Sequence, residues 1–264
     1  MKVSALNGMS DTSAHELTTR DHWDSAWQRP PRWRLPSKLF VGTRNLQRVI
    51  EPHVQPGMRY LELGCAPGKM LAWVASDLHA DVSGLDYSQR GIEWARRLFD
   101  TLGLRADLRC EDVWSTTFTP GVFDVVFSAG LIEHFDDPRA LVRLHLTLLK
   151  PGGRALITVP NYGGVYGRLQ GWFDPDNLAL HNLSIMSTEA LARLAPTDLA
   201  RSVRAYPAGR LSPWAVSIGH KWPGPIATGI SLAANGLGLI QPMDVVSLCP
   251  LLVLDIVRGD DPAC

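Results

Sequence analysis

Downstream of Gly57, short apolar runs alternate along the chain with segments of helical periodicity. The apolar runs predict strands over residues 59–63, 81–86, 106–110, 123–128 and 154–159. The segments between them predict helices over residues 69–78, 89–102 and 138–149. Strands that alternate with helices in this way are typical of a mostly parallel sheet with helices on both faces. The pattern therefore predicts an α/β fold for the middle of the chain.

The segments before and after this region do not show the regular alternation of strands and helices. A helix is predicted over residues 38–51, and the N-terminal arm before it, residues 1–37, ends in a stretch with three tryptophans that can fold over the domain or over a ligand. Two late strands are predicted over 201–206 and 250–257. Residues 161–186 and 207–248 break the pattern. We expect an arm followed by one domain, residues 38–264, that carries these two insertions.

The most membrane-like stretch, residues 226–240, has 15 residues and no charge. As a helix it is about 22 Å long, shorter than the hydrocarbon core of about 30 Å. We expect buried or covering structure there rather than an integral membrane segment, with contact to a membrane surface or a partner left open. The first residues lack the apolar core of a signal peptide, and the four cysteines form no CxxC pair. The chain is therefore expected in the cytoplasm, with reduced thiols.

Composition narrows the classes of partner. Lys plus Arg and Asp plus Glu are 26 each, so the formal net charge is zero. A general nucleic-acid binder uses a bulk positive field that this chain lacks. No His or Cys cluster has metal-ligand spacing, so no metal site is predicted. We expect a small-molecule substrate and no nucleic acid, with a second copy of the chain as a candidate partner.

The segment most informative about function is residues 60–69, where a predicted strand meets a predicted helix through a glycine turn. A phosphate-binding P-loop does not fit, because three residues rather than four separate Gly64 from Gly68, and Met70 follows Lys69. A dinucleotide fingerprint fits weakly, because Ala66 and Lys69 occupy two of its glycine positions.

A third pattern fits better. The frame Glu62-x-Gly64-x-Ala66-x-Gly68 resembles the first motif of class I S-adenosylmethionine-dependent methyltransferases, of the small-molecule, type 11-like family, with Ala66 in place of the middle glycine. Further motifs of that family are matched in order within residues 55–160, at Asp86, the Glu111–Trp114 segment, the Phe123–Phe135 segment and the Leu148–Gly153 segment. The resemblance implies a Rossmann-like sheet of seven mostly parallel strands, an inserted lid and S-adenosylmethionine as cofactor.

The resemblance also implies residue roles. Gly64, Cys65, Ala66 and Gly68 form the loop whose backbone approaches the cofactor, and Glu62 reaches its amino-acid end or braces that loop. Asp86 accepts hydrogen bonds from the ribose hydroxyls, and Tyr87 lies against the ribose or adenine. Asp112 accepts from the adenine amino group beside Val113. The methionine portion passes Ser128, Ala129 and Gly130.

The chemistry expected is methyl transfer by in-line displacement, most simply to oxygen, on a sugar, a lipid-like molecule or a secondary metabolite. His134 and His181 are the candidate general bases, because histidine titrates near neutral pH; a structural histidine is the alternative for each. Transfer to nitrogen or carbon stays open. So does a non-catalytic subunit that binds the cofactor without using it.

Overall fold

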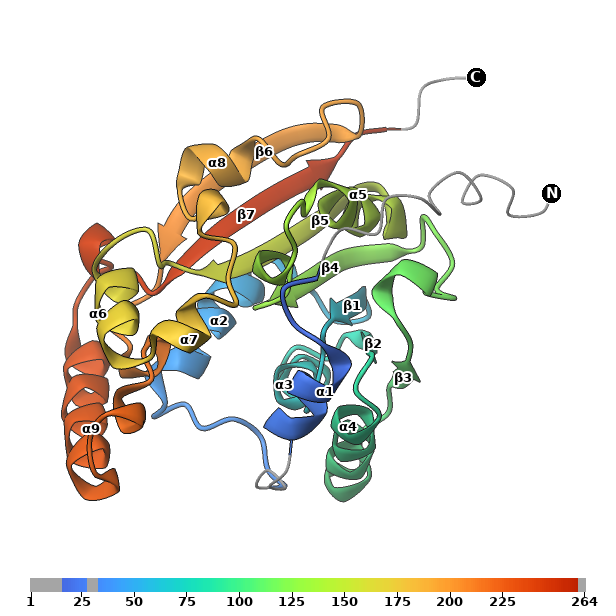
Figure 1. Ribbon diagram of the computed structural model, residues 1–264. Helices are drawn as coiled ribbons and strands as arrows, with labels where there is room; N and C mark the ends of the chain where they lie inside the picture. The colour runs from blue at the N-terminus through green and yellow to red at the C-terminus, as the bar shows by residue number, and fades with distance from the viewer. Residues whose placement is uncertain (1–15, 28–32, 261–264) are drawn as a thin grey trace.

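The computed structural model describes residues 16–27 and 33–260. Its framework is one seven-stranded sheet (Figure 1) with the order β3-β2-β1-β4-β5-β7-β6. The strands are β1 (Arg59–Leu63), β2 (Asp81–Asp86), β3 (Asp107–Cys110), β4 (Phe123–Ala129), β5 (Leu149–Pro160), β6 (Ala200–Ala208) and β7 (Leu251–Arg258). Only β7 runs antiparallel to its neighbours. The sequence prediction of a mostly parallel sheet is confirmed.

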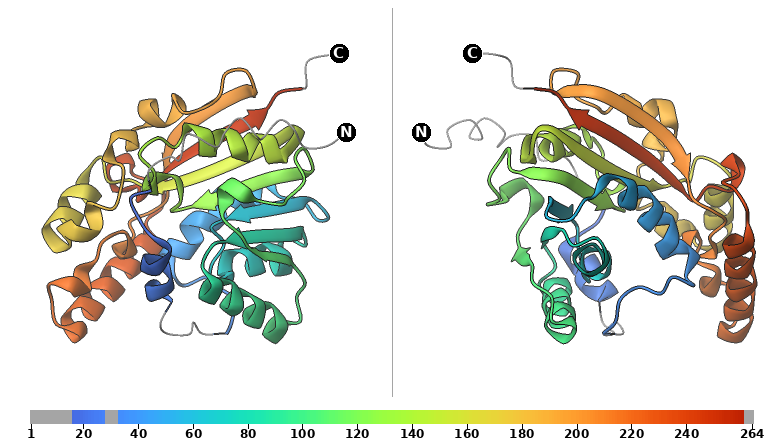
Figure 2. Two further views of the ribbon diagram at one scale, coloured as in Figure 1. Left: turned by 45° about the vertical axis from the view of Figure 1, so that its right-hand side comes forward. Right: turned by 180° about the vertical axis from the view of Figure 1, so that it is seen from behind.

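Helices cover both faces of the sheet (Figures 1 and 2). One face carries α2 (Val41–Ile50), α3 (Lys69–Asp77) and α4 (Gln89–Leu102), and the other carries α5 (Arg139–Leu148) and α8 (Thr188–Ala192). Each face has its own apolar cluster, centred on Phe127 and Tyr60 on the first side and on Val126 and Leu61 on the second. Alternate residues of a strand point to opposite faces, so a strand covered twice must be apolar throughout.

Helix α4 illustrates how local sequence sets an element's ends. Ser88 precedes the helix, and its hydroxyl accepts a hydrogen bond from the backbone N–H of Gly91 at 3.0 Å. Gly103 ends the helix in the left-handed conformation, with φ of 65°. Serine at the first position and glycine after the last satisfy backbone groups that the helix cannot pair. The predicted range 89–102 is confirmed.

The fifth strand starts earlier than the sequence predicts. The sequence predicts a helix to residue 149 and a strand from residue 154, but β5 begins at Leu149, which pairs with Phe123. Gly152 has φ of 74°, and a Cβ at Gly153 would lie 2.9 Å from the carbonyl oxygen of Lys150. These two glycines let the chain kink within the strand, and Lys150 forms an ion pair with Asp124 on β4.

The two insertions lie past the carboxyl end of β5, at the ends of the strands rather than at a lateral edge of the sheet (Figure 1). The first holds α6 (Val165–Phe173), α7 (Pro175–Leu178) and the short turn η4 (Leu183–Ile185). The second holds η5 (Pro213–Ala215), η6 (Ile218–His220), α9 (Gly224–Ile240) and η7 (Val246–Leu248). The remaining elements are α1 (Arg20–Ala26), η1 (Glu51–His53), η2 (Val113–Ser115) and η3 (Ile132–His134).

Helix α9 packs over its neighbours as covering structure, one of the two alternatives that the sequence left open for residues 226–240. Its large apolar side chains face outward: Leu232 is 62% exposed and Ile240 is 76% exposed. The buried face consists of small residues, Ala227, Ser231 and Gly238. A Cβ at Gly238 would lie 2.1 Å from the carbonyl oxygen of Leu211, so this face packs by close backbone approach. Across residues 16–27 and 33–260, no helix combines the length and apolarity needed to span a membrane.

Candidate active site

A cavity of about 520 Å³ opens at the carboxyl ends of β1, β2, β4 and β5. The sheet order reverses at this place, because the chain runs from β1 outward to β2 and β3 and then returns to β4 on the other side. Such a reversal leaves a crevice in which open α/β sheets bind ligands. The volume is within the usual range for small-molecule sites.

The glycine loop after β1 forms one wall. Gly64 and Gly68 both adopt the left-handed conformation, with φ of 74° and 82°. A Cβ at Gly68 would lie 2.8 Å from the Cβ of Ala95, so glycine is required there by space as well as by dihedral angle. Gly64 and Ala66 line the cavity, whereas Gly68 lies behind the wall, at the start of α3.

Asp86, the last residue of β2, lines the cavity and ties the loop to the sheet. One carboxylate oxygen accepts from the backbone N–H of Ala66 at 3.1 Å, and the other accepts from that of Ser88 at 2.9 Å. Burial raises the pKa of Asp86, and these two N–H donors oppose that rise. Each oxygen retains a lone pair for a further donor such as a ribose hydroxyl.

The next wall comes from the ends of β2 and β3. Asp112 begins η2 by accepting a hydrogen bond from the backbone N–H of Trp114 at 2.9 Å, and it lines the cavity with Val113 and Tyr87. The guanidinium of Arg20, from α1, lies 5.5 Å from the centre of the Tyr87 ring. Burial raises the pKa of Tyr87, which therefore stays a neutral phenol.

The end of β4 supplies the floor. Ala129 and Gly130 line the cavity, and Gly130 has φ of 70°. Ser128 does not line it: its hydroxyl is 2.9 Å from Nε2 of the buried His145 in α5. His145 donates from Nδ1 to the carbonyl oxygen of Leu141, so Ser128 is the donor to Nε2. The side chain of Ser128 therefore supports the floor from below.

Two other residues of the first motif also lie outside the lining. Glu62 is buried beneath the loop, one of its carboxyl oxygens has no hydrogen-bond partner, and burial raises its pKa to about 8. Cys65 is buried with its thiol directed at Gly84 of β2, where a Cβ would come within 2.8 Å of the sulfur. Of the roles considered for Glu62, only a position under the loop matches this burial.

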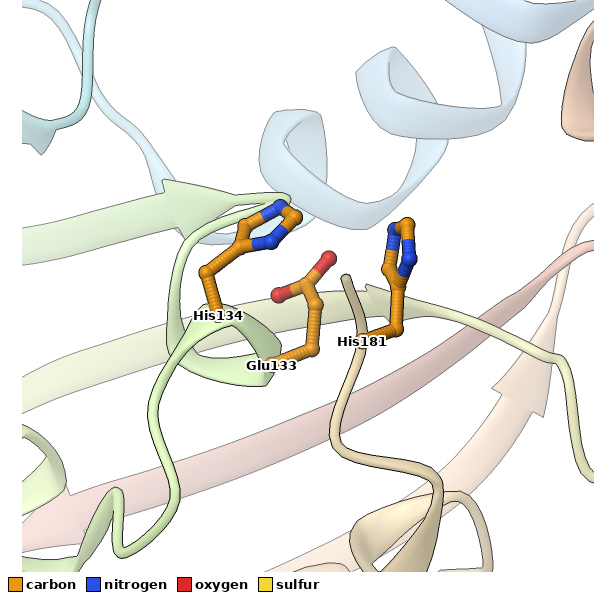
Figure 3. Close-up of side chains that lie close together, drawn as sticks. All are labelled: Glu133, His134 and His181. Carbon is orange, nitrogen blue, oxygen red and sulfur yellow. The ribbon is translucent and has the colours of Figure 1, made fainter. Parts of the chain in front are cut away.

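The opposite end of the cavity contains the two candidate histidines. His134 ends η3, and His181 lies between α7 and η4; their ring centroids are 4.8 Å apart. Glu133 lies between them with its carboxylate directed to the same space (Figure 3). All three line the cavity. Burial lowers the pKa of His134 to about 4 and also lowers that of His181, while burial raises the pKa of Glu133 to about 8.

Spacing along the chain predicts no metal site, but three side chains of metal-ligand type gather at this end of the cavity. Donor atoms of Glu133, His134 and His181 lie within 4.8 Å of one another. Spacing along the chain could not reveal the group, because residue 181 belongs to an insertion. The insertion is held in place by Asn182, whose backbone N–H donates to the carbonyl oxygen of Glu133 at 2.7 Å.

The described part of the N-terminal arm, residues 16–27, lies along the cavity, and the alternative that the arm folds over a ligand stays a prediction. Leu17 donates its backbone N–H to the carbonyl oxygen of His134 at 2.8 Å, and Glu16 forms a bridge with Phe135. The Trp23 ring packs edge-on against His134, 5.2 Å between centroids. Glu16, Thr18 and Trp23 line the cavity. The tryptophan pattern pointed to the arm, but no sequence signal singled out Glu16 or Thr18.

Comparison with known proteins agrees with this geometry. Residues 61–157 match the family model described as a methyltransferase domain. Phosphoethanolamine N-methyltransferase 3 of Arabidopsis thaliana is 34% identical over 125 residues, which are 45% of this chain and 25% of that protein. Ubiquinone biosynthesis O-methyltransferase of Xanthomonas euvesicatoria pv. vesicatoria is 30% identical over 141 residues, 53% of each. The chain thus spans a quarter to about half of these relatives.

Solved structures share the fold. A Haemonchus contortus phosphoethanolamine N-methyltransferase 2 with phosphomonomethylethanolamine and S-adenosylhomocysteine has a TM-score of 0.57 at 18% identity, covering 82% of this chain and 52% of that one. The plantazolicin methyltransferase in complex with S-adenosylhomocysteine has a TM-score of 0.51 at 18% identity, covering 84% and 83%. Residues 61–157 therefore match a methyltransferase domain, and the chain shares its fold with solved S-adenosylmethionine-dependent methyltransferases.

Proposed function

We propose that this protein transfers the methyl group of S-adenosylmethionine to an oxygen of a small, largely apolar acceptor. The observation that carries the proposal is a single cavity with two different ends. Asp86, Asp112 and the glycine loop line one end, and Glu133, His134 and His181 line the other. Gly130 lies between the ends, where a methyl group passing from one ligand to the other has to cross.

The cofactor end matches a nucleoside. Asp86 offers carboxylate oxygens at the tip of β2, the place where an acidic residue accepts from ribose hydroxyls in related α/β sites. Asp112 offers a second carboxylate one strand further along, beside the apolar Val113. An adenine ring held between these groups would direct its amino group toward Asp112, and the methionine portion would lie along Ala129 and Gly130.

The lining of the acceptor end favours an apolar, hydroxyl-bearing molecule over a phosphorylated one. Among the described residues that line the cavity, none is Lys or Arg, whereas Trp23, Leu131 and Phe135 contribute apolar surface. A phosphate group is normally bound by cationic side chains or by a helix N-terminus. The lack of cationic side chains in this lining disfavours phosphoethanolamine as the acceptor. It supports an uncharged acceptor with a hydroxyl group, the kind of molecule on which an O-methyltransferase acts.

The reaction is an in-line displacement. A lone pair of the acceptor oxygen attacks the methyl carbon, the bond between carbon and sulfur breaks, and sulfur keeps the electron pair as S-adenosylhomocysteine. The acceptor hydroxyl loses its proton to a group at the acceptor end. His134 and His181 are neutral near pH 7, so each can offer a lone pair there. Holding the two reactants together in one cavity lowers the barrier.

Transfer is tested with cofactor carrying an isotopically labelled methyl group. The protein is incubated with a catechol bearing an apolar tail and, in parallel, with phosphoethanolamine. We expect label on the phenolic oxygen and none on the amine, with one S-adenosylhomocysteine released per transfer. Label on the amine alone would contradict O-methylation, and cofactor binding without any transfer would favour a non-catalytic subunit.

Cofactor placement is tested separately by calorimetry. Asp86→Asn removes the charge at the tip of β2, and we expect the affinity for S-adenosylmethionine to fall by about tenfold or more, the effect of a lost charge-assisted hydrogen bond. Asp81→Asn is the matched control, because Asp81 begins the same strand at its opposite, exposed end. Equal affinity in both variants would place the ribose elsewhere.

A further inference from the structure

The acceptor end of the cavity contains three metal-ligand side chains with a shared direction. Glu133, His134 and His181 each bring one donor atom within 4.8 Å of the others. Figure 3 shows the carboxylate of Glu133 between the two imidazoles. Ligands bound to one metal at about 2.1 Å are at most about 4.2 Å apart. Side-chain rotations that move the donor atoms by about 1 Å bring all three within the distance that one metal ion allows.

The imidazoles are already oriented for ligation. Nδ1 of His134 is 2.9 Å from the carbonyl oxygen of Leu180, and Nδ1 of His181 is 2.9 Å from that of Asn177. A carbonyl oxygen can only accept, so each Nδ1 carries the hydrogen and each Nε2 has a lone pair. Histidine ligands commonly donate their second ring N–H to a backbone carbonyl, which fixes the ring and its tautomer.

Glu133 supplies the independent observation. Its side chain is 1% exposed, and Oε2 has no hydrogen-bond partner among the described residues. A buried polar atom without a partner costs free energy, and buried carboxylates are normally paired or coordinate a metal. Two nitrogen lone pairs and one carboxyl oxygen therefore face the same space, and once the carboxyl is ionised none of the three can donate to another. A bound cation satisfies all three at once.

We propose that Glu133, His134 and His181 bind a divalent transition metal ion of the zinc, cobalt or iron class at the acceptor end of the cavity. Two imidazoles and one carboxylate are a donor set that these ions prefer over magnesium or calcium. Three protein ligands leave coordination positions open, and all three residues line the cavity. An open position can receive the acceptor oxygen.

This role deepens the proposed function and rests on it. An acceptor hydroxyl bound to the ion would lose its proton to solvent more easily, because the positive charge would stabilise the oxygen anion. The two histidines then serve as ligands rather than as free bases. The first insertion supplies the ligand His181. The arm supplies Trp23, whose ring packs against His134.

Metal binding is tested without reference to activity. The full chain, freed of any tag and treated with chelator, is titrated with Co²⁺ and followed by its visible absorption, then with Zn²⁺ by calorimetry. We expect one ion per chain, with displacement of Co²⁺ by Zn²⁺. Glu133→Gln and His181→Asn should each weaken Zn²⁺ binding by about a hundredfold, since either change removes one of three ligands.

The matched control is His220→Asn, which removes an exposed histidine 3.9 Å from Asp174, outside the cavity lining. This variant should bind Zn²⁺ like the unchanged chain, and thermal unfolding verifies that each variant is folded. Absence of stoichiometric binding, or equal binding by all variants, overturns the metal site. Because S-adenosylmethionine affinity and label transfer are measured separately, a chain that transfers label after complete metal removal refutes the role of the metal in transfer and leaves the proposed function intact.

Discussion

The sheet and helix α9 use apolar residues in opposite ways. Phe127 in β4 is fully buried between two helix layers, whereas Leu232 in α9 is 62% exposed. Both lie in uncharged, apolar stretches of sequence. Strand residues are buried because layers cover the sheet on each face, while α9 contacts its neighbours through small residues and turns its large ones outward. Apolarity alone therefore does not tell whether a segment forms core or surface.

The largest expected effect is in the sheet. Phe127→Ala removes a ring that packs with Tyr60, 6.3 Å between centroids, in the cluster beneath the cavity. We expect a loss of about 3–5 kcal/mol in the free energy of unfolding, the usual cost of such a cavity. Urea denaturation measures it. A loss below about 1 kcal/mol would mean that this cluster can collapse into the space.

A smaller effect is expected at the glycine loop. Gly68→Ala places a methyl group 2.8 Å from the Cβ of Ala95 at φ of 82°. We expect the free energy of unfolding to fall by about 2 kcal/mol from strain and crowding together, and we expect weaker cofactor binding. Gly152→Ala is the matched control, with φ of 74° and no atom within 4 Å of the added methyl group. If both variants lose the same stability, crowding at residue 68 contributes nothing.

The buried carboxyl of Glu62 predicts a pH dependence. Its pKa is raised by burial from 4.5 to about 8, so the folded protein retains a proton that the unfolded chain releases. Stability from this group is complete below pH 4.5 and is lost as pH rises to about 8, at about 1.4 kcal/mol per pH unit. Glu62→Gln should reduce the slope of the stability profile in that window, leaving the part that comes from Glu133, whose pKa is also raised to about 8. If the slope of the free energy of unfolding against pH does not change, Glu62 is not the group that titrates in this window.

The smallest effect is expected in α9. Leu232→Ser exchanges an exposed apolar side chain, and we expect a change within about 0.5 kcal/mol in the free energy of unfolding. Gly238→Ala, on the buried face of the same helix, should cost more, because the added Cβ would lie 2.1 Å from a carbonyl oxygen. Thermal unfolding compares the two. A large loss for Leu232→Ser would show that the outer face is covered in solution.

The sequence by itself determined the sheet and most of the cofactor end. Apolar runs of strand length located β1 to β5 within a few residues, apart from the early start of β5, and the glycine motif located the loop beside Asp86. These features are local: a strand buried on both faces has to be apolar, and a left-handed turn favours glycine. Residues such as Gly64, Asp86 and Gly130 could be found because each lies at the end of a strand.

Only the tertiary structure decided what lies at the acceptor end. Glu133 and His181 are 48 positions apart, and their approach depends on an insertion held against η3 by Asn182. Burial of one face of α9 and exposure of the other likewise depend on which neighbours pack against it. Residues far apart in the chain meet through folding of irregular segments, and no periodicity records such a meeting. That is why the histidines were identified singly, and the cluster only in three dimensions.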